Sequence, residues 1–276
     1  MIYTQLTRSA LVGMACTKSR LCRDCHTQIC IRKSHTTAAN LNLTFENILD
    51  DVNKQRAIAR LTSVDAVRTT KEYGLKADHS YAAVLVPLCT VNKEPSLILT
   101  LRSSRLKKHR GQVSFPGGNS DKSDPDFIHT ALRETQEELG MDPSFFEIWG
   151  QMNPLPGSDG RKVVYPILAR TGEVNDETLN INRDEVEQAF CVSIRTLCDP
   201  RYFGVTHFRE GQGYTLPVYT GAAHRIWGLT AIIVHQTLSI LAPGLYAHKV
   251  KNKKYYSKAQ VKSTKPQQQL TTESKS

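Results

Sequence analysis

One segment constrains this chain more than any other: residues 127–139 carry three glutamates at helical spacing, and Gly140 follows directly. Residues three and four positions apart lie on the same face of an α-helix, so Glu134, Glu137 and Glu138 should share one side. Glycine commonly ends a helix in the left-handed conformation. The pattern therefore predicts a helix over residues 127–139 that gathers three carboxylates, whose mutual repulsion is destabilising unless a cation offsets it.

Three carboxylates on one face suit a divalent cation, because Mg²⁺ and Mn²⁺ prefer hard oxygen ligands. The turn Phe115-Pro116-Gly117-Gly118 precedes the helix. Its two glycines allow the backbone to approach a ligand closely, and the carbonyl group of Gly118 is a further candidate metal ligand. A solvated acidic helix face and a plain tight turn are the simpler interpretations of these two features.

The rest of the chain alternates helical and strand-like patterns between two tails, which predicts a single α/β (α+β) domain over residues 44–248. No apolar run approaches the roughly 20 residues of a membrane-spanning helix, so no membrane span is expected. The expected helices cover residues 46–61 and 226–241, the expected strands cover residues 81–89, 97–101, 148–152 and 163–168, and residues 184–197 mix a strand with a helical turn.

Both tails are basic. Residues 1–43 contain six Lys or Arg and one acid, and residues 249–276 contain eight Lys and one acid. Of the formal net charge of +10, residues 44–248 account for −2, which argues against a nucleic-acid-binding surface. A basic N-terminus rich in Ser and Thr is typical of a mitochondrial transit peptide; a basic arm without a targeting signal is the alternative. The Lys- and Gln-rich residues 249–276 are predicted to be a disordered tail.

The cysteines do not indicate a secreted protein. The chain has seven of them at irregular spacing, whereas a secreted disulfide framework uses an even number. Cys22, Cys25 and His26 match the spacing of a c-type haem attachment site, and with Cys30 they form a candidate zinc set. No second ligand pair follows at zinc-finger spacing, so neither interpretation is favoured.

The turn and the helix together resemble a known signature. Gly117 and Gly118, followed by Arg133-Glu134-Thr135-Gln136-Glu137-Glu138-Leu139-Gly140, are similar to the Nudix box. The spacer between Gly118 and Arg133 is one residue longer than in the usual box and contains no glutamate. It holds three aspartates instead, and the sequence does not indicate which of them pairs with Arg133: Asp121, Asp124 or Asp126.

Residues outside the box narrow the resemblance to one branch of the Nudix hydrolases. Residues 99–103, 111–118, 184–186 and 226–231 resemble the corresponding segments of coenzyme A diphosphatases, and the mitochondrial members of that branch agree with the basic N-terminus. The resemblance implies the Nudix fold, a mixed sheet sandwiched between helices. It implies hydrolysis of the diphosphate bond of coenzyme A or acyl-coenzyme A, giving 3′,5′-ADP and (acyl-)4′-phosphopantetheine.

The same resemblance implies catalytic and metal-binding roles. Glu134, Glu137 and Glu138 would hold Mg²⁺ or Mn²⁺, which neutralises phosphate charge and activates water. Glu134 and Glu138 are the expected indispensable pair, although the sequence does not separate base from ligand. Arg133 would orient these carboxylates by charge-assisted hydrogen bonds. Glu185 is a candidate late carboxylate, with an ordinary surface acid as the alternative.

A basic segment lies just before the catalytic turn. Arg102 and Arg105 are expected to contact the substrate, because guanidinium groups bind phosphate in a bidentate manner. His109 is either a donor to phosphate or structural. Lys107 and Lys108 are interpreted as solvated. We interpret Trp227 as a packing residue, although an aromatic ring can also stack on adenine.

Other functions stay open at this level. The chain could be a Nudix hydrolase of another nucleoside diphosphate derivative, such as a dinucleotide, ADP-ribose or an RNA cap, because a fold does not specify a substrate. A silent nucleotide- or RNA-binding module is disfavoured by the three glutamates. The expected partner is thus a small molecule, the expected location is mitochondrial, and cytoplasmic or peroxisomal locations are alternatives. The sequence says nothing about the oligomeric state.

Overall fold

The structure is a computed structural model that describes residues 42–62, 80–107, 109–157, 161–175, 178–208 and 214–250. The chain divides into two units, Met1–Leu41 and Asn42–Ser276, and all described residues belong to the second. The predictions for Cys22, Cys25, His26 and Cys30, for the transit peptide and for residues 251–276 therefore lie outside the described residues.

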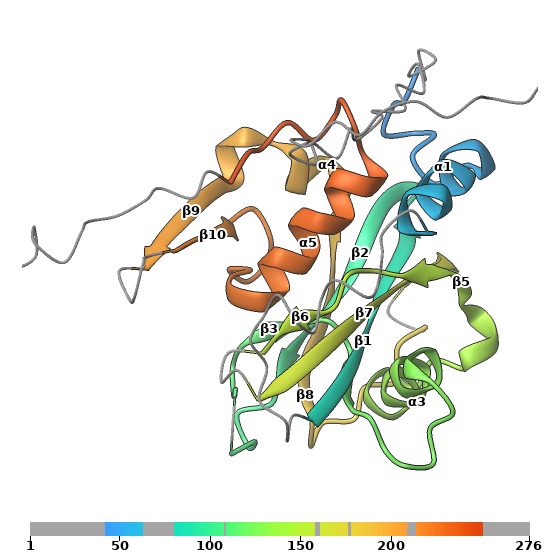
Figure 1. The fold of residues 1–276 in the computed structure, drawn as a ribbon, viewed down its shortest axis with the longest axis vertical. Coiled ribbons are helices and arrows are strands. Elements are labelled where there is room, and N and C mark those ends of the chain that lie inside the picture. Colours follow the sequence, from blue (N-terminus) through green and yellow to red (C-terminus); the bar gives the residue numbers. More distant parts are fainter. Residues whose placement is uncertain are drawn as a thin grey trace, which may run out of the picture. The chain divides into compact units, whose positions relative to one another are not determined.

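The described part combines helices with a large mixed sheet (Figure 1). In chain order the elements are α1 (Asp51–Thr62), β1 (Ser80–Val91), β2 (Glu94–Arg102), β3 (Val113–Ser114), β4 (Gly117–Asn119), α3 (Phe127–Leu139), the 3-10 turn η2 (Pro143–Phe145), β5 (Glu147–Gln151), β6 (Leu155–Pro156), β7 (Lys162–Glu173), β8 (Val186–Ser193), α4 (Ile194–Cys198), the 3-10 turn η3 (Pro200–Tyr202), β9 (Phe203–Phe208), β10 (Tyr214–Tyr219) and α5 (Gly228–Leu241).

Strand β1 organises the main sheet. It pairs antiparallel with β2 and with β4, and parallel with β7. Strand β8 pairs with β2, while β5 and β6 both pair with β7. The pairing of β4 with β1 brings the glycine turn to the centre of the sheet, where Ala83 lies opposite Gly118. Strands β9 and β10 form a separate hairpin (Figure 1).

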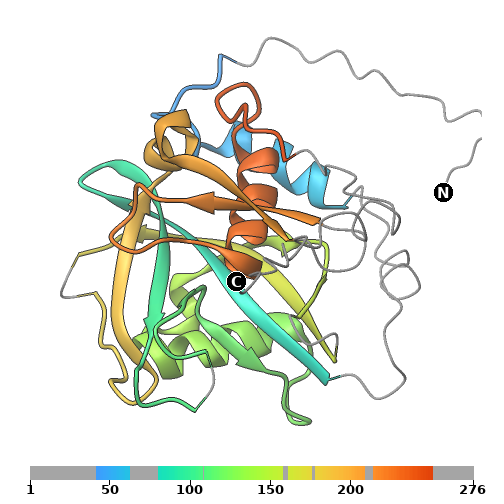
Figure 2. The same ribbon diagram turned by 90° about the vertical axis from the view of Figure 1, so that its left-hand side faces the viewer.

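The sheet separates two apolar layers. Successive side chains of a strand point to opposite faces, and in β1 Val86 and Leu88 pack in the cluster that includes α1 and α5, whereas Leu85 and Cys89 pack in the cluster that includes α3. Helix α3 therefore lies on one face of the sheet and helices α1 and α5 on the other (Figure 2). The predicted mixed sheet between helices is confirmed.

Most predicted elements are present, with shifted ends. The first helix begins at Asp51 rather than at residue 46, because the side chain of Asp50 accepts a hydrogen bond from the backbone of Asn53 and starts the helix there. The last helix begins at Gly228, because Ile226 is still held in a β-bridge to Tyr219.

Two other features differ from the expectations. Strands β1 and β2 extend beyond the expected residues 81–89 and 97–101, because the turn between them contains only Asn92 and Lys93, both with positive φ. The hairpin of β9 and β10 was not expected from the sequence. Within the described residues, none of the helices has the length and apolar character needed to cross a membrane.

Candidate active site

Helix α3 has the predicted bounds, because both of its ends carry local signals. At its start, the side chain of Asp126 accepts a hydrogen bond of 2.8 Å from the backbone N–H of His129. At its end, Gly140 adopts the left-handed conformation with φ 67°. Its inner side packs against β1 and β4, and Glu138 is among the residues buried there. The helix thus carries one of its glutamates into the protein interior.

Glu138 is a buried carboxylate with few compensating contacts. It is 1% exposed. The backbone N–H of Gly117 donates to its Oε2 at 3.3 Å, and Nη1 of Arg102 lies 3.6 Å from its Oε1. Burial raises the pKa of Glu138 to about 8, although Arg102 and the Gly117 N–H act in the opposite direction. A cation at this position would stabilise the ionised carboxylate.

Glu134 lies directly against the glycine turn. A methyl group on Gly118 would come within 2.4 Å of the Glu134 carboxylate, so only glycine leaves room for it. Gly117 has φ +149°, and a methyl group there would lie 2.3 Å from the carbonyl oxygen of Ala83. The first glycine thus permits the pairing with β1, and the second permits the approach of a glutamate. Burial also raises the pKa of Glu134.

Glu185 comes from a distant part of the sequence and lies within electrostatic range of the two helix glutamates. Its negative charge raises the pKa values of both Glu134 and Glu138, as expected for a like charge nearby. The loop that carries it is held in place, because the N–H of Ser103 donates to the carbonyl of Glu185 at 2.9 Å and the N–H of Asn182 donates to that of Glu138 at 3.0 Å. The role of Glu185 as a site carboxylate stays a prediction, with an ordinary surface acid as the alternative.

The side chain of Glu137 does not share the buried surroundings of Glu138 and Glu134. Its side chain is 50% exposed, and its nearest charged partner is Arg133, at 3.3 Å. Of the three helix glutamates, Glu134 and Glu138 therefore face the glycine turn, and Glu137 lies at the rim.

Asp124 is the main partner of Arg133. Its Oδ1 accepts a hydrogen bond from Nε, and its Oδ2 accepts one from Nη2, both at 3.0 Å. Asp121 lies 3.8 Å from the same guanidinium and is largely exposed, while Asp126 caps helix α3. Among the three aspartates of the spacer, the bidentate pair belongs to Asp124.

The donor set fits a divalent cation, although it is not a closed metal site. Within the described residues, no group of three or more His, Cys, Asp or Glu side chains is arranged around a common point. Arginines compensate part of the charge: Arg102 faces Glu138, and Arg133 contacts Glu134 at 3.1 Å. The remaining donors are the carboxylate oxygens of Glu134 and Glu138, which are half-buried and buried and have raised pKa values. Oxygen atoms of this kind are the ligands that hard cations prefer.

The three predicted substrate residues with polar side chains, Arg102, Arg105 and His109, have different surroundings in the structure. Among the described contacts of these three, only that of Arg102 is with a glutamate of the site, Glu138. Arg105 pairs with Asp184 at 2.8 Å, and both side chains are exposed. His109 has φ 56° and contacts Gln112 at 3.2 Å.

Two features of this region were not recognised in the sequence. Nζ of Lys162 donates to Oδ1 of Asn119 at 2.6 Å, directly after the glycine turn. A lysine at the start of an apolar strand carries no signal that distinguishes it from a surface residue. Trp227 is not a packing residue: it is 40% exposed, and Arg225 lies over its ring at 5.8 Å.

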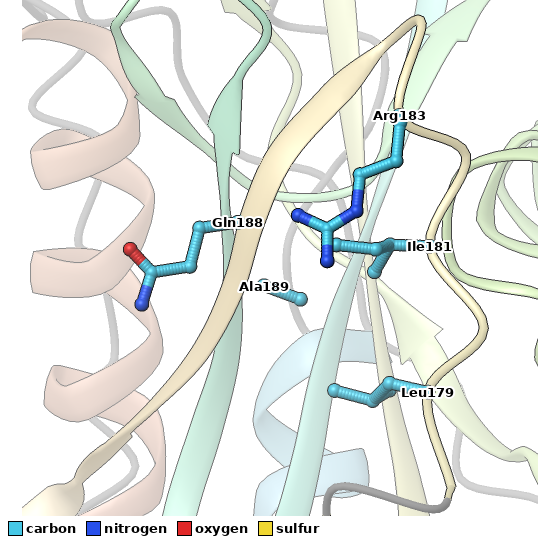
Figure 3. A pocket seen from close by; sticks show the side chains of 5 residues that line it. All are labelled: Leu179, Ile181, Arg183, Gln188 and Ala189. Carbon is cyan, nitrogen blue, oxygen red and sulfur yellow. The ribbon is translucent and has the colours of Figure 1, made fainter.

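A pocket of about 270 Å³ lies beside β8, next to the loop that leads to Glu185. Figure 3 shows side chains from this loop extending toward β8. Arg183 at its rim donates to the carbonyl of Glu187 at 2.8 Å. The pocket is lined by Leu179, Ile181, Arg183, Gln188 and Ala189.

Arg102→Gln should lower the melting temperature of the metal-free protein by about 2–4 °C, corresponding to roughly 1 kcal/mol. The reason is that the buried carboxylate of Glu138 loses the guanidinium that faces it. Saturating Mg²⁺ should restore most of this loss, since a cation takes over the neutralisation. Differential scanning fluorimetry with and without Mg²⁺ measures both effects. Arg105→Gln, which removes an exposed ion pair, is the control, and an equal loss in both variants would contradict the prediction.

The family model "NUDIX domain" matches residues 79–208. "Mitochondrial coenzyme A diphosphatase NUDT8" of Mus musculus is 47% identical over 65% of this chain and 85% of that protein. The protein of the same name from Homo sapiens is 46% identical, over 62% of this chain and 74% of its own length. "Nudix hydrolase 3" of Caenorhabditis elegans is 34% identical over 71% of this chain and 87% of that protein. The predicted resemblance is confirmed, and the chain belongs to the Nudix hydrolase family.

Proposed function

We propose that this protein hydrolyses the diphosphate bond of coenzyme A or acyl-coenzyme A, with 3′,5′-ADP and (acyl-)4′-phosphopantetheine as products. One observation carries the chemistry: Glu134 lies against Gly118 and Glu138 against Gly117, and burial raises the pKa of both carboxyl groups. The substrate is supported by 46–47% identity to two coenzyme A diphosphatases.

The donor set supports Mg²⁺ or Mn²⁺ as the cation. Glu134 and Glu138 would hold it, with Glu185, Glu137 and the carbonyl group of Gly118 as additional ligands. When bound, the cation neutralises charge on the bridging phosphates and lowers the pKa of a water molecule. Mg²⁺ and Mn²⁺ both suit carboxylate and carbonyl oxygens, whereas the soft metals prefer sulfur.

The chain's own residues supply orientation and proton transfer. Glu138 or Glu134 accepts the proton of the attacking water, since both carboxylates face the turn where the diphosphate would lie. Arg133 holds Glu134 in place through its Nη1 group. Arg102 is positioned to bind a phosphate oxygen once a cation neutralises Glu138, because its guanidinium already borders that carboxylate. Further candidates for binding the phosphates of the substrate are Arg105, His109 and Lys162. Arg105 and His109 lie in the segment before the glycine turn, and Lys162 contacts Asn119 directly after it.

We also propose the organisation and location of the protein. Residues 1–43 act as a mitochondrial transit peptide, residues 44–248 form the catalytic domain and residues 249–276 form a tail. This is supported by the basic composition of residues 1–43 and by relatives described as mitochondrial. A fluorescent protein fused behind residues 1–43 should enter mitochondria. Uniform cytoplasmic fluorescence would contradict the proposal, and peroxisomal fluorescence of the full chain would support that alternative.

Substrate and chemistry are tested together by incubating the protein with Mg²⁺ or Mn²⁺ and coenzyme A, acetyl-coenzyme A, a dinucleotide, ADP-ribose or capped RNA. Mass spectrometry identifies the products. We expect 3′,5′-ADP from the two coenzyme A substrates at rates well above those for the other compounds. Preference for ADP-ribose or capped RNA would reject coenzyme A as the substrate. Negligible turnover of every compound, unchanged in Glu138→Gln, would reject the enzymatic function.

A further inference from the structure

We propose that Trp227 and Arg225 bind the 3′-phosphoadenosine part of coenzyme A: the indole ring stacks on the adenine, and the guanidinium pairs with the 3′-phosphate. This inference rests on the proposed function, because it assigns two contacts to the same substrate. It concerns the segment between β10 and α5.

The first observation is the exposure of the indole ring. Trp227 is 40% exposed, although its neighbour Ile226 is fully buried. The exposed part of the ring is apolar surface in contact with water. A planar base that stacks on the ring removes this surface from water, and aromatic side chains bind bases in this way in many proteins.

The second observation is that the backbone on both sides of the ring is anchored. Ile226 and Tyr219 exchange two backbone hydrogen bonds of 2.9 Å each. The hydroxyl of Thr230 donates to the carbonyl of Val113 at 2.8 Å. Trp227 lies between these two anchored residues, so a ligand that stacks on it needs to order little of the chain.

The third observation is an available positive charge beside the ring. The guanidinium carbon of Arg225 lies 5.8 Å from the centroid of the Trp227 ring, within the range of a cation–π contact. Among the described residues, no carboxylate pairs with Arg225, whereas the exposed Arg105 and Arg195 each pair with an acid. The charge of Arg225 can therefore pair with a phosphate, which a guanidinium binds in a bidentate manner.

The fourth observation is the place where this segment is attached to the main sheet. Nε2 of His224 lies 2.8 Å from Oε1 of Gln188 in β8. At the other end of the segment, Thr230 is bound to Val113 in β3. The start of α5 accordingly lies beside β3 (Figure 1). Residues 224–230 are thus held at both ends by strands of the sheet.

These attachments place the segment near the candidate active site. Gln188 and Val113 both lie opposite Leu101 of β2, on its two sides. The next residue of β2 is Arg102, whose guanidinium faces Glu138. Because neighbouring strands are only about 4.8 Å apart, residues 224–230 border the end of the sheet at which the substrate diphosphate would lie.

The chemistry of coenzyme A matches this arrangement. A single ribose carries the adenine, the 3′-phosphate and, on its 5′ carbon, the diphosphate. An adenine-binding ring must therefore lie near the catalytic residues but outside them, and the cation for the 3′-phosphate must lie beside that ring. ADP-ribose and simple dinucleotides lack the 3′-phosphate, so Arg225 would favour coenzyme A over both.

Binding is measured first with 3′,5′-ADP, which carries the adenine and the 3′-phosphate but has no diphosphate bond to cleave. The chain has two tryptophans, and Trp149 is only 3% exposed. Stacking on Trp227 should therefore dominate the quenching of tryptophan fluorescence when 3′,5′-ADP is added to the full chain with Mg²⁺. We expect 5′-AMP, which lacks the 3′-phosphate, to bind about 10-fold more weakly. 4′-Phosphopantetheine should leave the fluorescence unchanged.

Isothermal titration calorimetry compares the variants, because it does not depend on tryptophan. Trp227→Leu should weaken the binding of 3′,5′-ADP and of 5′-AMP alike, by about 10-fold. Trp227→Phe keeps an aromatic ring and should stay within about 3-fold of the wild type. Arg225→Gln should weaken the binding of 3′,5′-ADP by about 10-fold and leave that of 5′-AMP unchanged.

The matched controls are an arginine and an aromatic residue elsewhere on the surface. Arg195 also lies over a ring, that of Phe45, but it pairs with Glu94 at the start of β2, the end of that strand opposite to Arg102. Tyr214 is 42% exposed in the hairpin of β9 and β10. Arg195→Gln and Tyr214→Leu should bind both nucleotides as the wild type does.

Turnover gives a second readout. Trp227→Leu should raise the KM for coenzyme A by about 10-fold with kcat within about 2-fold, because stacking far from the cleaved bond is the same in the ground state and the transition state. Arg225→Gln should raise the KM for coenzyme A but not that for 3′-dephospho-coenzyme A, which has no phosphate for the guanidinium to bind.

The inference is overturned if Trp227→Leu binds 3′,5′-ADP as the wild type does, or if Arg225→Gln weakens 3′,5′-ADP and 5′-AMP equally. Quenching by 4′-phosphopantetheine but not by 3′,5′-ADP would also overturn it, because the ring would then contact the other half of the substrate. Its failure is distinguishable from that of the proposed function. A wild type that cleaves coenzyme A, with an unchanged KM in both variants, rejects this subsite alone, whereas a wild type that cleaves no coenzyme A rejects the function.

Discussion

Glu138→Gln should reduce the turnover of coenzyme A by about 10³-fold, equivalent to roughly 4 kcal/mol of transition-state stabilisation. Glutamine keeps an oxygen that can accept the hydrogen bond from the Gly117 N–H, but it loses the negative charge that holds a cation. The metal-free protein should not lose stability, because the substitution removes the cost of a buried carboxylate whose pKa is already raised to about 8.

Two measurements check this prediction. The rate of 3′,5′-ADP release gives the loss of turnover, and the melting temperature with and without Mn²⁺ shows whether the cation still binds to the native state. Mn²⁺ should raise the melting temperature of the wild type but not that of Glu138→Gln. Glu137→Gln is the matched control: its side chain is 50% exposed at the rim, so a smaller loss is expected. Equal losses in both variants would contradict the assignment of Glu138 as the central ligand.

Gly118→Ala should lower turnover by about 10–100-fold while preserving the fold. The added methyl group would lie 2.4 Å from the Glu134 carboxylate, which is the far end of a side chain and can move away. The backbone therefore need not shift, but Glu134 must leave the position in which it faces the cation. The expected signature is a weaker Mn²⁺ affinity with a melting temperature close to that of the wild type.

Two other glycines provide the comparison for this variant. Gly117→Ala should destabilise the protein, because its methyl group would lie 2.3 Å from the Ala83 carbonyl oxygen and its φ of +149° disfavours alanine. Gly172→Ala meets no atom within 4 Å and should leave both stability and Mn²⁺ affinity unchanged. Unchanged Mn²⁺ affinity in Gly118→Ala would show that Glu134 does not need its present position.

The sequence predicted the parts of the site that depend on neighbours along the chain. Helix α3 has the expected bounds because Asp126 and Gly140 provide its caps, and the helical repeat places Glu134 and Glu138 on one side. The two glycines were recognisable for a similar reason, since a pair of residues without side chains indicates a close backbone approach.

Other features depended on contacts between distant segments. The three aspartates of the spacer have the same chemistry, and only the path of the folded loop brings Asp124 into bidentate contact with Arg133. Trp227 lies in an apolar stretch, yet it is exposed because it precedes helix α5 at the surface. Neither outcome follows from composition or periodicity.

The sequence alone therefore specified the family, the catalytic helix and the glycine turn, because each rests on interactions within a few residues. The tertiary structure decided which charges meet. It placed Arg102 beside Glu138 and Glu185 near both helix glutamates, and it distinguished the inward Glu134 and Glu138 from the outward Glu137. Electrostatic pairing depends on distance and burial in the folded chain, and neither quantity is encoded in the spacing of residues along it.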